Sequence, residues 1–282
     1  MQRDGDYIRA DLHTHTYYSD GKYSPAELLT KAKACGLHYL SITDHDNVDG
    51  IEEAIETAKE LGIELVSGVE LSSEHNGREV HILGYFIDHQ NPELLEYLKG
   101  FRQLRLKRAE KIVDKLNALN IPLKMTDVLM KVRDNTSIGR PHIAIAMLEN
   151  NFISNYYEAF IKFIGDNKPA YEKKPNISTK AAIDLIANSG GLSFIAHPGK
   201  VIRDEMLVDI IELGVDGIEV VHPSHPSEYI NYFQDFVSQY FLLESGGSDF
   251  HGGRLNDDSV LGSYWISEQK VTAMKNRLFL NK

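Results

Sequence analysis

Residues 8–15 read Ile-Arg-Ala-Asp-Leu-His-Thr-His, a short strand-like segment that ends in two histidines. On an extended segment, side chains two positions apart point the same way, so the imidazoles of His13 and His15 can reach one ion. Because the chain contains 12 histidines, one such pair alone arises easily by chance. The segment therefore predicts a metal site only if other strands end in the same way.

Ligand-type residues do recur along the chain, at or just beyond the ends of further predicted strands. The full candidate set is His13, His15, Asp20, His45, Glu70, His81, His197, Asp249 and His251. Glutamate at the end of an apolar strand needs a partner, since burying a lone carboxylate is costly. A carboxylate can bridge two cations whereas an imidazole binds one, so Glu70 is the natural bridge. Asp44 and Asp46 are expected to orient His45 through hydrogen bonds.

The order of predicted elements indicates an α/β fold interrupted by a helical insertion. The first part, 1–95, alternates strands and helices and contains the hairpin residues Asn76-Gly77. The insertion, 96–175, shows helical periodicity with almost no strand signal. The last part, 176–282, resumes the alternation. With the insertion removed, about seven strands alternate with helices, which favours a (β/α) barrel whose chemistry collects at the C-terminal ends of the strands.

The boundaries of these elements are predicted as follows. Strands are expected at 8–12, 39–43, 64–69, 79–87, 192–196, 217–221, 241–244 and 260–266, and helices at 24–34, 49–61, 126–134, 141–149, 154–163, 179–189, 203–213, 226–239 and 269–279.

The composition limits the partners of the protein. A net charge of −11 disfavours binding of long duplex DNA and is compatible with a small phosphorylated substrate held by cations. No apolar run approaches the roughly 18 residues that span a bilayer, so no membrane association is expected. The charged first residues show no signal peptide, and the single cysteine, Cys35, excludes an intrachain disulfide. Both features predict a cytoplasmic protein; the oligomeric state is left open.

For several other polar residues the sequence gives a weaker signal of a functional role. Arg140 and His142, in Gly-Arg-Pro-His-Ile-Ala at 139–144, could bind phosphate, since arginine matches that group with two parallel hydrogen bonds. His222 ends a predicted strand and is a third candidate for substrate binding. The remaining histidines, His38, His75, His89 and His225, are expected to be exposed or satisfied by ordinary hydrogen bonds. A basic row on one predicted helix is expected to be a solvated face: Arg102, Arg105, Lys107, Arg108 and Lys111.

The metal-ligand pattern resembles the PHP (polymerase and histidinol phosphatase) superfamily of metal-dependent phosphoesterases. The matching segments are Asp11-Leu12-His13-Thr14-His15, Ser19-Asp20-Gly21, Ile42-Thr43-Asp44-His45-Asp46, Gly68-Val69-Glu70, His81-Ile82-Leu83-Gly84-Tyr85, Ala196-His197-Pro198 and Gly247-Ser248-Asp249-Phe250-His251. The chain is most similar to the branch that acts on nucleotides and short RNA ends. That branch carries a helical insertion after the His81 motif and a segment like residues 139–144.

The resemblance implies a distorted (β/α)7 barrel, an inserted helical lid domain and two to three divalent ions: manganese, iron or zinc. His13, His15, Glu70 and Asp249 would hold one ion, Glu70, His81 and His197 a second, and Asp20, His45 and His251 a third. Glu70, Asp249 and His197 are assigned to catalysis, with Arg140, His142 and His222 binding the substrate. The expected activity is hydrolysis of a nucleoside 3′,5′-bisphosphate or of the 5′ end of a short oligoribonucleotide.

Three alternatives remain open. Another small-molecule phosphomonoesterase of the same superfamily, such as a histidinol phosphatase, would use the same ligands. An amidohydrolase barrel also opens with two such histidines, but it would not explain Asp20 and would leave the Asp249–His251 pair surplus. A non-catalytic metal-binding or polymerase-associated module is disfavoured by the intact ligand set.

Overall fold

The computed structural model describes residues 7–132, 137–199, 202, 204–253 and 259–280. The chain divides into two compact units, one made of Met1–Leu95 with Asn176–Lys282 and the other of Glu96–Pro175. Among the described helices, none is both long and apolar enough to cross a membrane.

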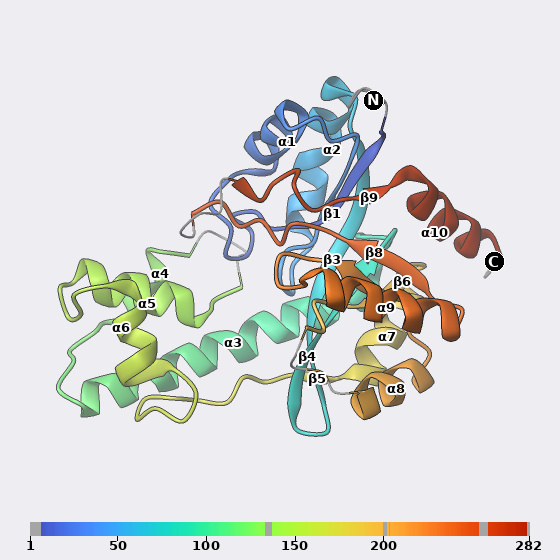
Figure 1. Cartoon of the computed structure of the whole chain (residues 1–282). Helices are drawn as coiled ribbons and strands as arrows, with labels where there is room; N and C mark the ends of the chain where they lie inside the picture. Colours follow the sequence, from blue (N-terminus) through green and yellow to red (C-terminus); the bar gives the residue numbers. More distant parts are fainter. Residues whose placement is uncertain (1–6, 133–136, 200–201, 203, 254–258, 281–282) are drawn as a thin grey trace. The chain divides into compact units, whose positions relative to one another are not determined.

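The first unit is built on a mixed sheet that the described residues form in the order β8-β7-β6-β4-β3-β2-β1-β9, with β5 pairing with β3 (Figure 1). The strands are β1 (Arg9–Thr14), β2 (Tyr39–Ile42), β3 (Glu64–His75), β4 (Arg78–Tyr85), β5 (Ile177–Ser178), β6 (Leu192–Ile195), β7 (Gly217–Val221), β8 (Leu243–Gly246) and β9 (Ile266–Ser267).

The two ends of this sheet approach each other and nearly close it into a barrel. The backbone N–H of His15, just after β1, donates to the carbonyl of Phe250, just after β8, at 2.9 Å. Thr14 and Phe250 also form a parallel bridge. The near-closure involves β1–β4 and β6–β8, and it confirms the predicted distorted seven-stranded α/β barrel.

One barrel strand, β4, runs against its neighbours, which corrects the expectation that every ligand follows the C-terminal end of a strand. Strand β4 pairs antiparallel with both β3 and β6. Asn76 and Gly77 form the hairpin turn with φ of 49° and 79°, the positive values that a tight hairpin requires. Glu70 therefore lies inside β3, and His81 is the fourth residue of β4, opposite Ser72. Because β4 is reversed, its beginning reaches the barrel edge where its neighbours end.

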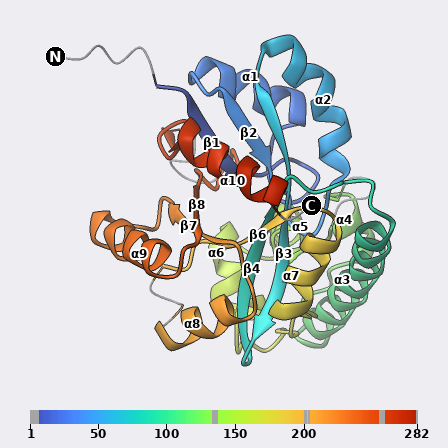
Figure 2. The same cartoon turned by 90° about the vertical axis from the view of Figure 1, so that its right-hand side faces the viewer.

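Helices cover the outside of the barrel (Figure 2). They are α1 (Pro25–Ala34), α2 (Asp49–Leu61), α7 (Thr179–Asn188), α8 (Asp204–Glu212), α9 (Ser227–Gln239) and α10 (Glu268–Leu280). Helix α1 begins as predicted with a capping box: Glu27 N–H donates to the Ser24 hydroxyl, and the Ser24 N–H donates to the Glu27 carboxylate. Apolar residues of α1 and α2, such as Leu28 and Ala54, pack on Leu40 and Ile42 of β2. The apolar contacts that stabilise this side of the barrel therefore lie between the sheet and its helices, and the rim of the barrel carries polar side chains.

The described residues of the second unit form helices and no strand. The long helix α3 (Pro92–Ala118) begins in the first unit and continues into the second. It is followed by α4 (Met125–Leu129), α5 (Arg140–Glu149), α6 (Tyr156–Ala159) and a π-helix, η1 (Phe160–Ile164). Ile112 and Leu116 of α3 share one buried cluster with Ile143 and Met147 of α5. This cluster gives the unit an apolar core of its own.

The basic row on α3 is only in part the solvated face that was predicted: Lys107 and Lys111 are exposed, but two arginines are buried. Arg105 and Arg108 are only 9% and 7% exposed. Arg105 donates to the carbonyl of Ile138 at 2.8 Å, and Arg108 donates to the carbonyl of Glu172 at 2.9 Å. Lys111 pairs with the carboxylate of Glu172 at 3.1 Å. Because arginine places several donors on a long stem, these residues tie distant segments of the unit to α3.

Other predicted details also need correction. The final strand expected at 260–266 shrinks to β9, which pairs antiparallel with β1, because residues 259–263 form turns instead. The helix expected at 126–134 ends at Leu129, while positions 133 and 134 lie outside the described residues, as does 203 at the expected start of α8. The helix expected at 154–163 is α6 continued by η1.

Gly247 allows β1 and β8 to approach, and its replacement by alanine is expected to destabilise the barrel. A Cβ atom there would lie 2.4 Å from the backbone nitrogen of His13 and 2.5 Å from its Cβ. Overpacking of this kind typically costs about 1–3 kcal/mol. We expect a lower thermal unfolding midpoint for Gly247→Ala. Gly253→Ala is the control, because its added Cβ would meet only Lys22 side-chain carbons, at 3.5 Å. Equal midpoints for the two variants would contradict this account of the closure.

Candidate metal centre

The structure brings all nine predicted ligands into one continuous cluster at a single edge of the barrel. Overlapping groups of three or four side chains have ligand atoms within 4.8 Å of one another: His15 with Asp20, His45 and His251; His13 with His15 and Glu70; His45 with Glu70 and His81; and His13 with His222 and Asp249. His197 joins the cluster through Glu70. Residues from seven barrel strands or the loops that follow them, β1–β4 and β6–β8, thus meet at one place.

Four of these side chains surround a single point. The Nε2 atoms of His13 and His15 are 3.1 Å apart. Glu70 Oε2 lies 3.3 and 3.4 Å from these two atoms, and Asp249 Oδ1 lies 3.4 and 3.1 Å from them. Atoms bound at about 2.1 Å around one tetrahedral ion are roughly 3.4 Å apart. The spacing and the mixed imidazole–carboxylate donors therefore fit one divalent cation.

The second oxygen of Glu70 faces a different pair of imidazoles. Glu70 Oε1 lies 2.7 Å from His81 Nδ1 and 2.9 Å from His197 Nε2. The other nitrogen of His81, Nε2, is 3.0 Å from the Glu79 carboxylate, which fixes the proton there and leaves Nδ1 as the ligand atom. Since its two oxygens face separate groups, Glu70 has the arrangement of a carboxylate that bridges two ions.

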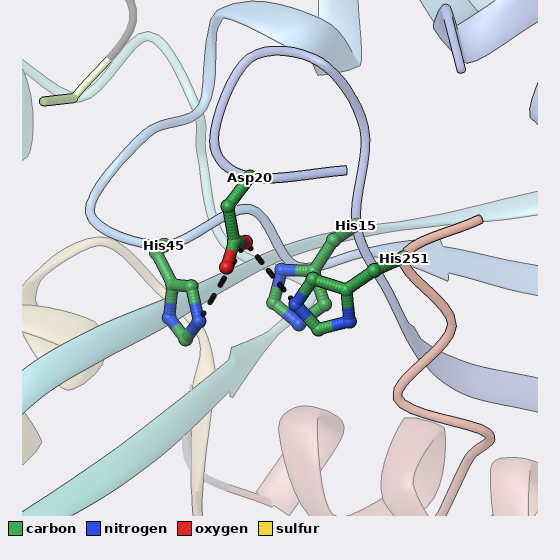
Figure 3. A group of neighbouring side chains, drawn as sticks. All are labelled: His15, Asp20, His45 and His251. Atoms are coloured by element: carbon green, nitrogen blue, oxygen red, sulfur yellow. Dashed lines mark ion pairs between the residues drawn. The ribbon is translucent and has the colours of Figure 1, made fainter. Parts of the chain in front are cut away.

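A third group lies beside the first and contains His15, Asp20, His45 and His251 (Figure 3). Asp20 Oδ1 is 3.1 Å from His251 Nε2 and 3.9 Å from His45 Nε2. The Nδ1–H of His251 donates to the carbonyl of Asp249 at 2.7 Å, so its Nε2 carries the lone pair that faces Asp20. This group also has the donors of a cation site.

The electrostatic environment favours ionised carboxylates and a neutral His15, whereas burial of His13 is outweighed by Glu219, Glu70 and Asp249, which raise the pKa of that imidazole well above its usual value. Burial alone raises the pKa of Glu70, Asp20 and Asp249, but the surrounding imidazoles lower each pKa well below its usual range. Burial also lowers the pKa of His15 to about 3, and the neighbouring His251 acts in the same direction. Ionised carboxylates and neutral imidazoles are the protonation states that metal ligands need.

Two of the predicted ligands have strained backbones. His197 has a φ of 27° and Asp249 a φ of 49°, in the left-handed region that non-glycine residues rarely adopt. Such strain persists only where surrounding contacts hold it, and it is often found at functional sites. Both residues lie in the loops after barrel strands, His197 after β6 and Asp249 after β8, and their side chains enter the cluster.

Buried carboxylates that support the cluster were only partly foreseen. Asp44 accepts hydrogen bonds from Thr16 and Ser19, which corrects its expected role as a partner of His45. Asp46 accepts from the N–H and hydroxyl of Ser72. Glu219, inside β7, was missed although it is fully buried and contacts two predicted ligands. Its signal was a charged residue in the middle of an apolar strand.

The predicted substrate-binding residues lie in different units. His222 follows β7 and belongs to the cluster. Arg140 and His142 begin α5 in the second unit, where Arg140 pairs with Asp166 at 2.7 Å and His142 Nδ1 accepts from the N–H of Gly139 at 3.1 Å. The histidines expected to be ordinary make ordinary contacts. His38, His75 and His89 contact protein groups outside the cluster. His225 is buried beside the ring of His222, and its two ring nitrogens contact the Val220 carbonyl and the N–H of Gly199.

Comparisons with known proteins agree with this geometry. The model of the PHP domain matches residues 11–205. A 5′-3′ exoribonuclease from Haemophilus influenzae is 36% identical over 247 residues, covering 86% of this chain and 89% of that protein. A 3′,5′-nucleoside bisphosphate phosphatase from Chromobacterium violaceum is 34% identical over 254 residues, with the same coverage.

A solved structure supports the same conclusion. The crystal structure of a Bifidobacterium adolescentis protein, assigned as a metal-dependent phosphoesterase, superimposes with a TM-score of 0.86 at 32% identity and covers 95% of both chains. The protein therefore belongs to the PHP domain family and is a metal-dependent phosphoester hydrolase.

Proposed function

We propose that the protein hydrolyses a phosphate ester of a nucleotide, either a nucleoside 3′,5′-bisphosphate or the 5′ end of a short oligoribonucleotide. The observation that carries the proposal is the double contact of Glu70, whose Oε2 faces His13 and His15 while its Oε1 faces His81 and His197. A carboxylate placed in this way would help to hold two cations, which together would supply Lewis-acid chemistry to one phosphate.

The side chains of the cluster have distinct tasks in this proposal. Bound cations would ionise a coordinated water near neutral pH and neutralise charge on the phosphate. Glu70 and Asp249 would supply the negative charge that retains the cations. The strained backbone of His197 places its Nε2 beside Glu70 Oε1. His222 contacts the substrate from within the cluster. Arg140 and His142 are proposed to bind another anionic part of the substrate, because a guanidinium suits a phosphate geometrically.

The number and identity of the ions are also proposals. The three groups described above suit two to three divalent ions. Their mixed imidazole and carboxylate donors accept manganese, iron or zinc, so that metal availability decides occupancy. The proposed lid role of residues 96–175 and a cytoplasmic location remain predictions from the sequence.

The substrate class draws its support from the relatives, one named an exoribonuclease and the other a bisphosphate phosphatase. The first name describes an enzyme that degrades RNA in the 5′-to-3′ direction, and the second an enzyme that removes phosphate from a nucleoside 3′,5′-bisphosphate. The net charge of −11 is compatible with a small substrate held by cations rather than with a long duplex.

A substrate panel tests the proposal. The manganese-loaded protein is assayed with adenosine 3′,5′-bisphosphate, a short RNA with a 5′-phosphate, and histidinol phosphate. We expect kcat/KM for at least one of the first two to exceed that for histidinol phosphate by about 100-fold or more, because specific contacts to a substrate commonly supply such ratios. A preference for histidinol phosphate would replace the proposal with the phosphomonoesterase alternative. Failure to hydrolyse any ester with metal bound would favour a non-catalytic role.

A further inference from the structure

Among the imidazoles near the Asp249 carboxylate, those of His13 and His222 approach its two different oxygens, and distance alone makes both of them candidate metal ligands. His13 Nε2 is 3.4 Å from Asp249 Oδ1, and His222 Nε2 is 3.6 Å from Asp249 Oδ2. All three residues also form one group with ligand atoms within 4.8 Å. An imidazole nitrogen binds a cation only if it carries a lone pair, so the hydrogen bond at the other ring nitrogen decides which role is possible.

For His13, that hydrogen bond is made to Glu219. His13 Nδ1 lies 2.8 Å from Glu219 Oε1, and both side chains are fully buried. The other oxygen of Glu219, Oε2, accepts from the backbone N–H of His197, so the side chain acts as a carboxylate that accepts hydrogen bonds at both oxygens. A carboxylate that accepts from His13 places the ring proton on Nδ1. When His13 carries a single proton, its lone pair is therefore on Nε2, which faces the cluster.

For His222, the Nδ1 atom accepts a hydrogen bond, whereas Nδ1 of His13 donates one. The backbone N–H of Ser224 donates to His222 Nδ1 at 3.0 Å, and the Ser224 hydroxyl lies 2.8 Å from the same atom. A backbone amide can only donate, so Nδ1 carries the lone pair. In the neutral ring the proton is then on Nε2. That nitrogen is buried, faces Asp249 and has no hydrogen-bond partner among the described residues.

We propose that Glu219 and Ser224 give these two histidines different roles: His13 is a metal ligand, and His222 is a neutral N–H donor to a phosphate oxygen beside Asp249. This inference rests on the proposed phosphoesterase function and assigns the contact that His222 makes. His222 does not transfer its proton, since loss of the Nε2 proton would leave a ring with no proton at all. Its N–H instead fixes the orientation of the phosphate and stabilises negative charge on one oxygen.

Glu219 has a second contact that makes it a positioning residue for two ligands. Its Oε2 accepts from the backbone N–H of His197 at 2.7 Å, the residue with φ of 27°. One carboxylate thus sets the tautomer of His13 and holds the strained backbone of His197. A glutamine at this position has only one acceptor oxygen, so it would turn an N–H group towards either His13 or His197 and lose one of the two contacts.

The test separates metal binding from phosphate binding. His222→Ala, His222→Gln and Glu219→Gln are purified, and His89→Ala serves as the matched control, because His89 pairs with Glu52 away from the cluster. Manganese content and affinity are measured for each variant, and the affinity for inorganic phosphate is measured on the manganese-loaded protein. Circular dichroism verifies that each variant folds.

Opposite results are expected for the two positions. His222→Ala keeps the wild-type manganese content and binds phosphate about 10- to 100-fold more weakly, the loss expected for one hydrogen bond to a charged group. His222→Gln, whose amide can still donate, recovers part of that affinity. Glu219→Gln binds manganese about 10- to 100-fold more weakly, as is typical when the partner of a ligating histidine is changed.

Two outcomes would overturn the inference. If both His222 variants lost manganese, His222 would be a ligand; if His222→Ala bound phosphate normally, its N–H would not contact that group. The proposed function can fail separately: should the wild-type protein bind manganese and phosphate as described but hydrolyse no ester, the function would be wrong while the role of His222 would stand.

Discussion

Glu70→Gln is expected to lower kcat for the preferred phosphate ester by at least about 1,000-fold. The substitution conserves the size of the side chain but removes the charge and one of the two oxygens that face separate groups of imidazoles. Loss of the bridge would remove several kcal/mol of transition-state stabilisation, and each 1.36 kcal/mol is tenfold in rate. The measurement is kcat at saturating manganese, with metal content determined in parallel.

A second glutamate on the same strand provides the matched control. Glu64 begins β3, is exposed and pairs with Lys275 on the surface. Exposed pairs contribute about 0–1 kcal/mol, so Glu64→Gln should keep its activity and nearly all of its stability. If Glu70→Gln retained wild-type activity in saturating manganese, a bridging role for Glu70 would be ruled out.

Removal of metal is expected to abolish hydrolysis and to lower the thermal unfolding midpoint by roughly 10 °C. A ligand present at about 1,000 times its dissociation constant stabilises the folded state by about 4 kcal/mol, and each kcal/mol shifts the midpoint of a chain of this size by about 2–4 °C. The expected loss follows from the geometry, since carboxylates and imidazole lone pairs converge within 3.1–3.4 Å and require a positive charge between them.

Chelation followed by elemental analysis and differential scanning calorimetry measures this effect. Addition of Mn²⁺, Fe²⁺ or Zn²⁺ to the stripped protein should restore both activity and midpoint, and the ion that restores most identifies the preferred metal. Glu70→Gln, in which the centre is already weakened, should show a much smaller shift on chelation. An unchanged midpoint and rate after verified removal of metal would contradict a metal-dependent mechanism.

The sequence predicted the barrel well because its signals are local. Alternating strands and helices, the capping box at Ser24 and the hairpin at Asn76-Gly77 can each be recognised within a few residues, and all appear in the structure. The gathering of nine polar side chains could also be foreseen, because parallel strands end at a common edge. The hairpin signal already implies that β4 reverses direction, but the local patterns did not show that His81 would reach this common edge from the beginning of its strand.

Other features depended on contacts between distant residues. Glu219 meets His13 across 206 positions of sequence, so only the closed barrel reveals that it supports a ligand. Arg105 and Arg108 follow the pattern of a solvated helix face. The carbonyls of Ile138 and Glu172 that accept their hydrogen bonds belong to segments later in the chain. Periodicity describes one element at a time, whereas these roles arise from pairs of elements.

The reversed strand β4 has a consequence for the order in which the centre forms during folding. Glu70 and His81 are only 11 positions apart and are joined by one hairpin, whereas His197 is 127 positions from Glu70. Contacts that are local in sequence form with little loss of chain entropy, while distant ones form late. We expect the β3–β4 hairpin to place two of the three ligands around Glu70 Oε1 early. The third, His197, arrives only when β6 docks, so capture of an ion by this group would report the docking of β6 on β4.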